Sequence, residues 1–131
     1  YSSGSARDEY YTKANRDTFV IATIENMNGV QEMREIINTA GIDGIGVGIF
    51  DMSVAMGLPG QTNSPEVRAV VNDAIKEARR SGKIFTTMIM DPEEAAGVEQ
   101  DVCRLVMCGA PEMHLQNYLN ATVEKVRQLL K

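Results

Sequence analysis

Residues 18–53 read TFVIATIENMNGVQEMREIINTAGIDGIGVGIFDMS, a stretch with two apolar runs on either side of a helical pattern. The runs at about 18–25 and 44–50 show no alternation of polar and apolar residues, which is typical of parallel strands buried on both faces. Between them, apolar residues recur at helical spacing over about 29–39, after the turn signal Asn28-Gly29. The stretch therefore predicts a strand, a helix and a second strand parallel to the first.

Each apolar run ends on a carboxylate, Glu25 in the first and Asp51 in the second. Because neighbouring parallel strands end at the same edge of a sheet, we expect both carboxylates on one rim. Two carboxylates suit Mg²⁺ or Mn²⁺, which prefer oxygen ligands. Such an ion keeps further coordination positions free, two of which a bidentate 2-oxo acid can occupy. The metal would then act as a Lewis acid that stabilises an enolate. The glycine-rich second run and the backbone N–H groups of Phe50 and Asp51 could receive the substrate carboxylate.

The rest of the chain continues the alternation of strands and helices. We expect a short helix at 8–15 with acidic residues in its first turn, and a polar loop at 52–64. A helix over 65–81 has Ser64 as its N-cap and Gly82 as its stop. One of its faces is apolar and is predicted to be buried: Val67, Val70, Val71, Ala74, Ile75 and Ala78.

Three further elements complete the predicted fold. A third strand at 84–90 precedes Asp91-Pro92-Glu93-Glu94, a capping sequence for a helix that reaches about residue 100. A fourth strand at about 104–108 leads to a helix opened by Pro111, with one apolar face: Leu115, Leu119, Val123, Val126 and Leu130. The predicted fold class is α/β, with four strand–helix units in a parallel sheet that is either open or a barrel segment.

Length and composition make several classes of function less favoured for this chain. The 131 residues suffice for one domain but fall short of the ~250 residues of a complete (β/α)8 barrel. A net charge of −5 without a basic stripe disfavours nucleic acid and anionic membranes as partners. No apolar run approaches the ~20 residues of a membrane span and no signal peptide is recognisable, so a cytoplasmic protein is expected. Cys103 and Cys108 are expected to be reduced, buried thiols.

The pattern of residues resembles the HpcH/HpaI aldolase family of metal-dependent 2-oxo acid aldolases. The similarity covers most of the chain, and the leading segment at 8–15 resembles the helix before the family's fifth barrel strand. It rests on the following matches in order: Ile24-Glu25, Asn28-Gly29-Val30, Ile37, Gly41-Ile42-Asp43-Gly44, Gly48, Asp51-Met52-Ser53, Met56-Gly57, Gly60-Gln61 and Pro65-Glu66-Val67.

The resemblance implies a phosphoenolpyruvate/pyruvate-type TIM barrel, of which residues 1–131 would be the carboxy-terminal half, strands five to eight. It implies that Glu25 and Asp51 bind a divalent metal (Mg²⁺, Mn²⁺ or Co²⁺) and that Thr23, Gly48, Phe50 and Asp51 contact the substrate. The reaction implied is reversible retro-aldol cleavage of a 4-hydroxy-2-oxo acid to pyruvate and an aldehyde. Two positions depart from the family pattern, which commonly has Gln at Thr23 and Pro at Ile49.

The resemblance also implies that part of the site lies outside this chain. The family's catalytic base, a His with a partner Asp, and its substrate-binding Arg come from earlier strands, so no catalytic residue is assigned here. His114, the only histidine, is expected to be a surface or capping residue. The partner that completes the barrel would be an amino-terminal half or a second copy of this chain, because a four-strand half-barrel exposes two sheet edges.

Two alternatives remain open at the level of sequence. The chain could be a non-catalytic half-barrel that serves as a structural or binding module. It could also be a fragment of a citrate-lyase-type enzyme that acts on acyl-CoA thioesters, which would require a surface for coenzyme A.

Overall fold

A computed structural model describes residues 4–130, which form four parallel strands and their helices in an α/β arrangement. Strands β1 (Ile21–Ile24), β2 (Gly44–Val47), β3 (Ile84–Ile89) and β4 (Cys103–Cys108) form one sheet in the order β1-β2-β3-β4. The predicted parallel sheet of repeated strand–helix units is therefore confirmed. Residues 1–3 and 131 of the predicted domain lie outside the described residues.

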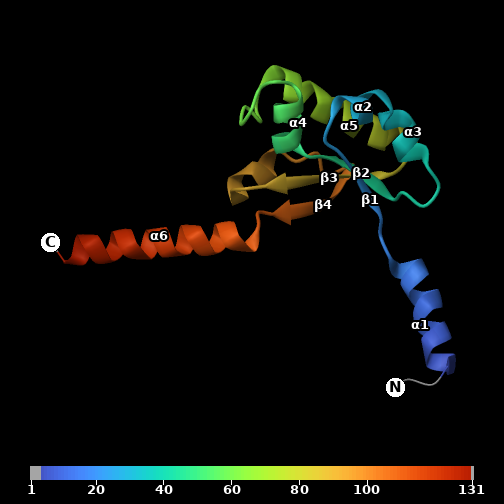
Figure 1. The fold of residues 1–131 in the computed structure, drawn as a ribbon, viewed down its shortest axis with the longest axis horizontal. Coiled ribbons are helices and arrows are strands. Elements are labelled where there is room, and N and C mark those ends of the chain that lie inside the picture. The colour runs from blue at the N-terminus through green and yellow to red at the C-terminus, as the bar shows by residue number, and fades with distance from the viewer. Residues whose placement is uncertain (1–3, 131) are drawn as a thin grey trace.

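Helices α2 (Met27–Gln31), α3 (Met33–Asn38), α4 (Ile49–Ala55) and α5 (Pro65–Ser81) lie on the same side of the sheet (Figure 1). The 3₁₀ helix η1 (Pro92–Gly97) links β3 to β4. Helices α1 (Gly4–Asp17) and α6 (Pro111–Leu129) extend away from the sheet at the two ends of the chain (Figure 1). No helix within residues 4–130 is both long enough and apolar enough to cross a membrane.

Helix α5 follows the sequence prediction closely. Its six predicted core residues are all buried against the sheet, so the apolar face is confirmed. The Ser64 hydroxyl accepts a hydrogen bond of 3.3 Å from the Val67 N–H and caps the first turn. Gly82 ends the helix with φ +68°, a conformation that glycine adopts without a steric penalty. Helix α5 packs on β2 and β3 and covers one face of the sheet there.

The prediction that both runs form strands buried on both faces is correct for β2, where Gly44, Ile45 and Gly46 are buried, and wrong for β1, where Thr23 is exposed. Helices cover one face only, and on the other face Thr23, Leu105 and Met107 are exposed, the last two to 42% and 44%. Strand β2 is better covered, because Ile21 and Ile84 fold their side chains over the position of Gly44. Strand β1 is also shorter than predicted: Phe19 and Val20 precede it and are exposed.

The start of the sheet is held together by Asp43. Its carboxylate accepts a hydrogen bond of 2.7 Å from the Val20 N–H, and its own N–H donates to the Val20 carbonyl at 2.8 Å. Its carbonyl accepts from the Ile84 N–H at 3.3 Å. Asp43 thus links the beginnings of β1, β2 and β3 by hydrogen bonds, at the side of the sheet opposite to the carboxyl ends of the strands.

Several helix predictions need correction. The predicted helix at 29–39 is two helices, α2 and α3, and Asn28-Gly29 lies inside α2 because Asn26 is the N-cap, accepting from the Gly29 N–H at 2.9 Å. The predicted helix at 91–100 is only the 3₁₀ helix η1, which ends at Gly97. Helix α1 begins at Gly4, so the acidic residues predicted for its first turn lie beyond that turn.

The apolar face predicted for the last helix is not covered in this chain. Helix α6 buries no residue, and its five predicted face residues are all exposed. The helix forms where the sequence predicts it, but the surface that would bury this face is not provided by residues 4–130.

Candidate functional site

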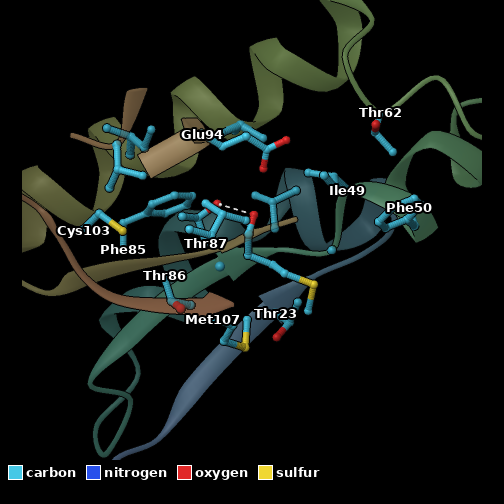
Figure 2. A pocket seen from close by; sticks show the side chains of 18 of the residues that line it. Thr23, Ile49, Phe50, Thr62, Phe85, Thr86, Thr87, Glu94, Cys103 and Met107 are labelled. Carbon is cyan, nitrogen blue, oxygen red and sulfur yellow. Dashed lines mark hydrogen bonds between the residues drawn. The ribbon is translucent and has the colours of Figure 1, made fainter. Parts of the chain in front are cut away.

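A pocket of about 790 Å³ opens where the strands end, between the sheet, the first turn of α5 and η1. Figure 2 shows Thr23 and Met107 on one side of it and Glu94 on the other, with Phe50 and Thr62 at one end. The strand ends and the beginning of α5 share this rim because α5 runs antiparallel to the strands it connects. Carboxyl ends of parallel strands are the usual place for ligand sites in α/β folds.

Glu25 comes directly after β1, is exposed, and lines this pocket. Its side chain lies against the backbone of Gly48, just after β2. A Cβ atom at position 48 would stand 2.8 Å from the Glu25 Cγ and 2.9 Å from its Oε1. The Gly48 N–H also donates to the Ile24 carbonyl at 3.0 Å. The absence of a side chain at Gly48 therefore leaves the space that the Glu25 side chain occupies.

Asp51 also lines the pocket, but its local structure differs from the prediction. The sequence predicted a strand to residue 50 followed by a loop, whereas β2 ends at Val47 and Asp51 lies in the first turn of α4. The Met52 N–H donates to the Gly48 carbonyl at 2.8 Å and starts the helix. Met52 is buried within this helix, while Phe50 is 54% exposed.

All residues predicted to contact a substrate line the same pocket: Thr23, Gly48, Phe50 and Asp51. The structure thus brings them together with Glu25 at one rim, although they come from two segments more than twenty residues apart. Their roles in binding stay predictions.

The electrostatic character of the pocket suits a cation. Within residues 4–130, its lining carries the carboxylates of Glu25, Asp51, Glu94 and Glu99 and the guanidinium of Arg68, and Glu99 is paired with Arg79 at 2.6 Å. No cluster of three or more His, Cys, Asp or Glu side chains is arranged to hold a metal in this part of the chain. Glu25 and Asp51 would therefore supply two ligands, which fits Mg²⁺ or Mn²⁺ because these ions retain several water or substrate oxygens.

Sequence reasoning missed the pocket residues that come from α5, from the loop before it and from η1. Thr62 and Asn63 come from the loop before α5, and Arg68 comes from its first turn. Glu94 lines the pocket from η1 and accepts a hydrogen bond of 2.8 Å from the Met90 N–H. The Ser64 cap could have located Arg68 at this rim, because a helix that crosses back between parallel strands starts at their carboxyl ends.

The remaining titratable candidates lie outside the pocket or in its wall. His114 does not line it; its Nε2 lies 2.7 Å from the Cys108 carbonyl oxygen at the start of α6. Cys103 lies in the wall, where burial raises the pKa of its thiol and so disfavours the thiolate. Cys108 is exposed, which contradicts the prediction of a buried thiol, because helix α6 leaves the sheet instead of covering the end of β4.

The comparisons with known proteins point to one family. The profile of the HpcH/HpaI aldolase/citrate lyase family matches residues 2–117. The chain is 32% identical over 101 residues to a hydroxypyruvate/pyruvate aldolase of Pseudomonas aeruginosa, a match that covers 77% of this chain and 38% of that protein. It is 36% identical over 87 residues to a 4-hydroxy-2-oxo-heptane-1,7-dioate aldolase of Escherichia coli, covering 66% and 33%.

A solved structure has a similar fold. The crystal structure of citrate synthase SbnG matches with a TM-score of 0.84 at 26% identity, over 97% of this chain and 51% of that one. The chain therefore spans about half of this structure and between 33 and 38% of the two curated relatives. Since the family profile covers most of its residues, this chain belongs to the HpcH/HpaI aldolase/citrate lyase family.

Proposed function

We propose that this chain supplies the metal-binding and 2-oxo-acid-binding part of a metal-dependent carbon–carbon lyase. The reaction would be that of a pyruvate aldolase, cleavage of a 4-hydroxy-2-oxo acid to pyruvate and an aldehyde. The observation that carries the proposal is that Glu25 and Asp51, which follow neighbouring parallel strands, line one acidic pocket in a chain of an aldolase family.

In this proposal Glu25 and Asp51 hold the divalent metal, Mg²⁺, Mn²⁺ or Co²⁺. The bound ion supplies Lewis-acid stabilisation of the negative charge that develops when the carbon–carbon bond breaks. Gly48 supports the metal site indirectly, because the space beside its Cα accommodates the Glu25 side chain. Carboxylate ligands held by such neighbours bind metal more tightly than free ones.

The substrate carboxylate would bind to the backbone N–H groups of Phe50 and Asp51. Both lie in the first turn of α4, before Met52 donates the first hydrogen bond within the helix. First-turn N–H groups have no acceptor in their own helix, so they are available to an anion. Thr23 lines the same pocket and would contact the substrate from β1.

The proposal includes a partner. We propose that residues 1–131 correspond to strands five to eight of a (β/α)8 barrel, and that an amino-terminal half or a second copy covers the uncovered sheet face. The exposed Leu105, Met107 and Met88 support this, because apolar side chains on one sheet face are normally buried. Sedimentation of the purified chain tests it: a stable monomer at micromolar concentration would contradict a second copy as the partner.

The metal site is tested by titration calorimetry of Mn²⁺ and oxalate, an analogue of the pyruvate enolate. We expect metal-dependent oxalate binding by the parent chain and its loss in Glu25→Ala and in Asp51→Ala. Asp73→Ala is the matched control, since it removes an exposed carboxylate of α5 that pairs with Lys76 and does not line the pocket. Unchanged oxalate binding in both site variants would rule out the assignment.

Turnover is a separate measurement. Because the family's base and substrate-binding Arg are not assigned in this chain, we expect little or no release of pyruvate from a 4-hydroxy-2-oxo acid by the chain alone. The similarity to a citrate synthase favours one alternative, a lyase that acts on acyl-CoA thioesters. Binding of acetyl-CoA instead of oxalate in the same calorimetric titration would favour that alternative.

A further inference from the structure

The hydroxyl of Ser53 is fully buried inside α4 and makes two hydrogen bonds. It donates to the Phe50 carbonyl at 2.7 Å and accepts from the Gly60 N–H at 3.2 Å. The Ser53 backbone carbonyl accepts a third bond, of 2.7 Å, from the Leu58 N–H. Ser53 does not line the pocket, so any influence on a ligand must pass through the groups that it holds.

The first of these groups is the peptide unit between Phe50 and Asp51. A trans peptide is planar, with its C=O and N–H pointing in opposite directions. No cis peptide bond occurs within residues 4–130. A hydrogen bond that fixes the Phe50 carbonyl therefore also fixes the direction of the Asp51 N–H. This N–H belongs to the pair proposed to receive the substrate carboxylate.

The second group is the loop that follows α4. The loop turns at Gly57 and Gly60, which have φ values of +73° and +76°. It then supplies Thr62 and Asn63 to the pocket wall before α5 begins. The bond from the Gly60 N–H to the Ser53 hydroxyl anchors this loop two residues before Thr62. One buried hydroxyl thus joins the turn proposed to bind the carboxylate to the loop that carries Thr62 and Asn63.

We propose that Ser53 is a positioning residue of the 2-oxo acid site: it directs the Phe50–Asp51 peptide at the ligand's carboxylate and anchors the loop that carries Thr62 and Asn63. The inference rests on the proposed function. It separates two tasks within α4, because the Asp51 side chain would hold the metal whereas the Asp51 N–H, set by Ser53, would hold the organic anion.

The test is Ser53→Ala, measured by titration calorimetry with Mn²⁺ alone and with oxalate at saturating Mn²⁺. We expect the oxalate affinity to fall about tenfold, as for the loss of one positioned hydrogen bond, while the Mn²⁺ affinity changes less than about twofold. The matched control is Ser81→Ala. The Ser81 hydroxyl also donates to the carbonyl three residues earlier, Ala78 at 3.0 Å, but at the end of α5 and away from the pocket.

Both variants are studied at a temperature where circular dichroism shows each to be folded. Ser53→Cys keeps a weak donor at nearly the same volume, so its oxalate affinity should lie between those of the parent and Ser53→Ala. If Ser53→Ala does not fold, the comparison is made with Ser53→Cys, which should bind oxalate more weakly than the parent.

The outcomes distinguish this inference from the proposed function. A parent chain that binds no oxalate in the presence of Mn²⁺ contradicts the proposed function itself. A parent that binds oxalate, together with Ser53 variants that bind it equally well, overturns the role of Ser53 alone. Equal losses of Mn²⁺ and oxalate affinity in the Ser53 variants would also overturn it, because they would indicate a general structural effect.

Discussion

Glu25 and Gly48 are in direct contact at the rim of the sheet. The Glu25 side chain occupies the space that a Cβ atom of residue 48 would fill, and its Oε1 lies 2.9 Å from the position of that Cβ. Gly48→Ala should therefore displace the Glu25 carboxylate. Since the displaced group is exposed and flexible, we expect little change in the free energy of unfolding but a Mn²⁺ affinity about tenfold lower. Titration calorimetry and urea unfolding measure the two quantities. Val54→Ala, at an exposed position of α4, is the control.

Gly44 differs from Gly48 although both are glycines of the same segment. A Cβ at Gly44 would lie 2.7 Å from the Ile84 carbonyl oxygen, an atom of the sheet backbone that cannot move aside. We expect Gly44→Ala to lower the free energy of unfolding by about 1–3 kcal/mol, as overpacking does in a core. The urea midpoint measures this. A Gly44→Ala variant as stable as Gly48→Ala would contradict the prediction.

Arg79 joins α5 to the turn before β4 through two carboxylates. Its Nε and Nη2 donate to Asp101 at 2.9 and 3.1 Å, and its Nη2 also donates to Glu99 at 2.6 Å. The hydrogen bonds from Arg79 lower the pKa of Asp101 below its ordinary value of 3.8. The Asp101 carboxyl of the folded chain therefore binds its proton less tightly than that of the unfolded chain. The stability that the Arg79–Asp101 pair contributes is complete above about pH 4 and is lost as the pH falls through the folded-state pKa of Asp101.

The corresponding measurement compares urea midpoints of the parent and Arg79→Gln at pH 7 and pH 3. The parent should be the more stable at pH 7, and the difference should shrink at pH 3. Arg127→Gln, which breaks an exposed pair with Glu124 on α6, should show no such dependence. A difference for Arg79→Gln that is the same at both pH values would show that the ion pair is not its cause.

Ser64 is the side chain that starts α5. Ser64→Ala should lower the free energy of unfolding by about 1 kcal/mol, because the Val67 N–H loses its acceptor. Ser64→Asp retains an acceptor and adds a negative charge near the helix N-terminus, so it should restore the stability. Chemical unfolding of the three proteins measures the effect. Equal losses for the two variants would contradict a capping role.

Helix α5 could be predicted from sequence because its signals are local. Ser64, Pro65 and Gly82 mark its ends, and the apolar spacing marks its buried face. Helix α4 was missed because its N-cap is Gly48, which makes no side-chain hydrogen bond and leaves no capping signal. Its first residues, Ile49 and Phe50, also continue the apolar run of β2, so a strand pattern extends into the helix.

The candidate site was predictable where it depends on strand ends. Glu25 and Asp51 follow two apolar runs, and the pairing of β1 with β2 brings these ends to one pocket. Arg68 and Glu94 were not predicted, because they reach the pocket through the packing of α5 and η1 and not through any local pattern. The exposed face of the sheet was not predicted either. An apolar run without alternation indicates that both faces of a strand are to be covered, but it does not show whether the covering residues belong to the same chain.

The lack of buried residues in α6 has a consequence for backbone dynamics. Its hydrogen bonds can open without disturbing the core, because none of its side chains is buried. Amide hydrogens of α6 should exchange with solvent close to the rate of an isolated 19-residue helix. Those of β2 and α5 should exchange only when the whole sheet unfolds. A hydrogen-exchange profile of the chain would thus divide it into a slowly exchanging centre and a rapidly exchanging carboxy-terminal helix.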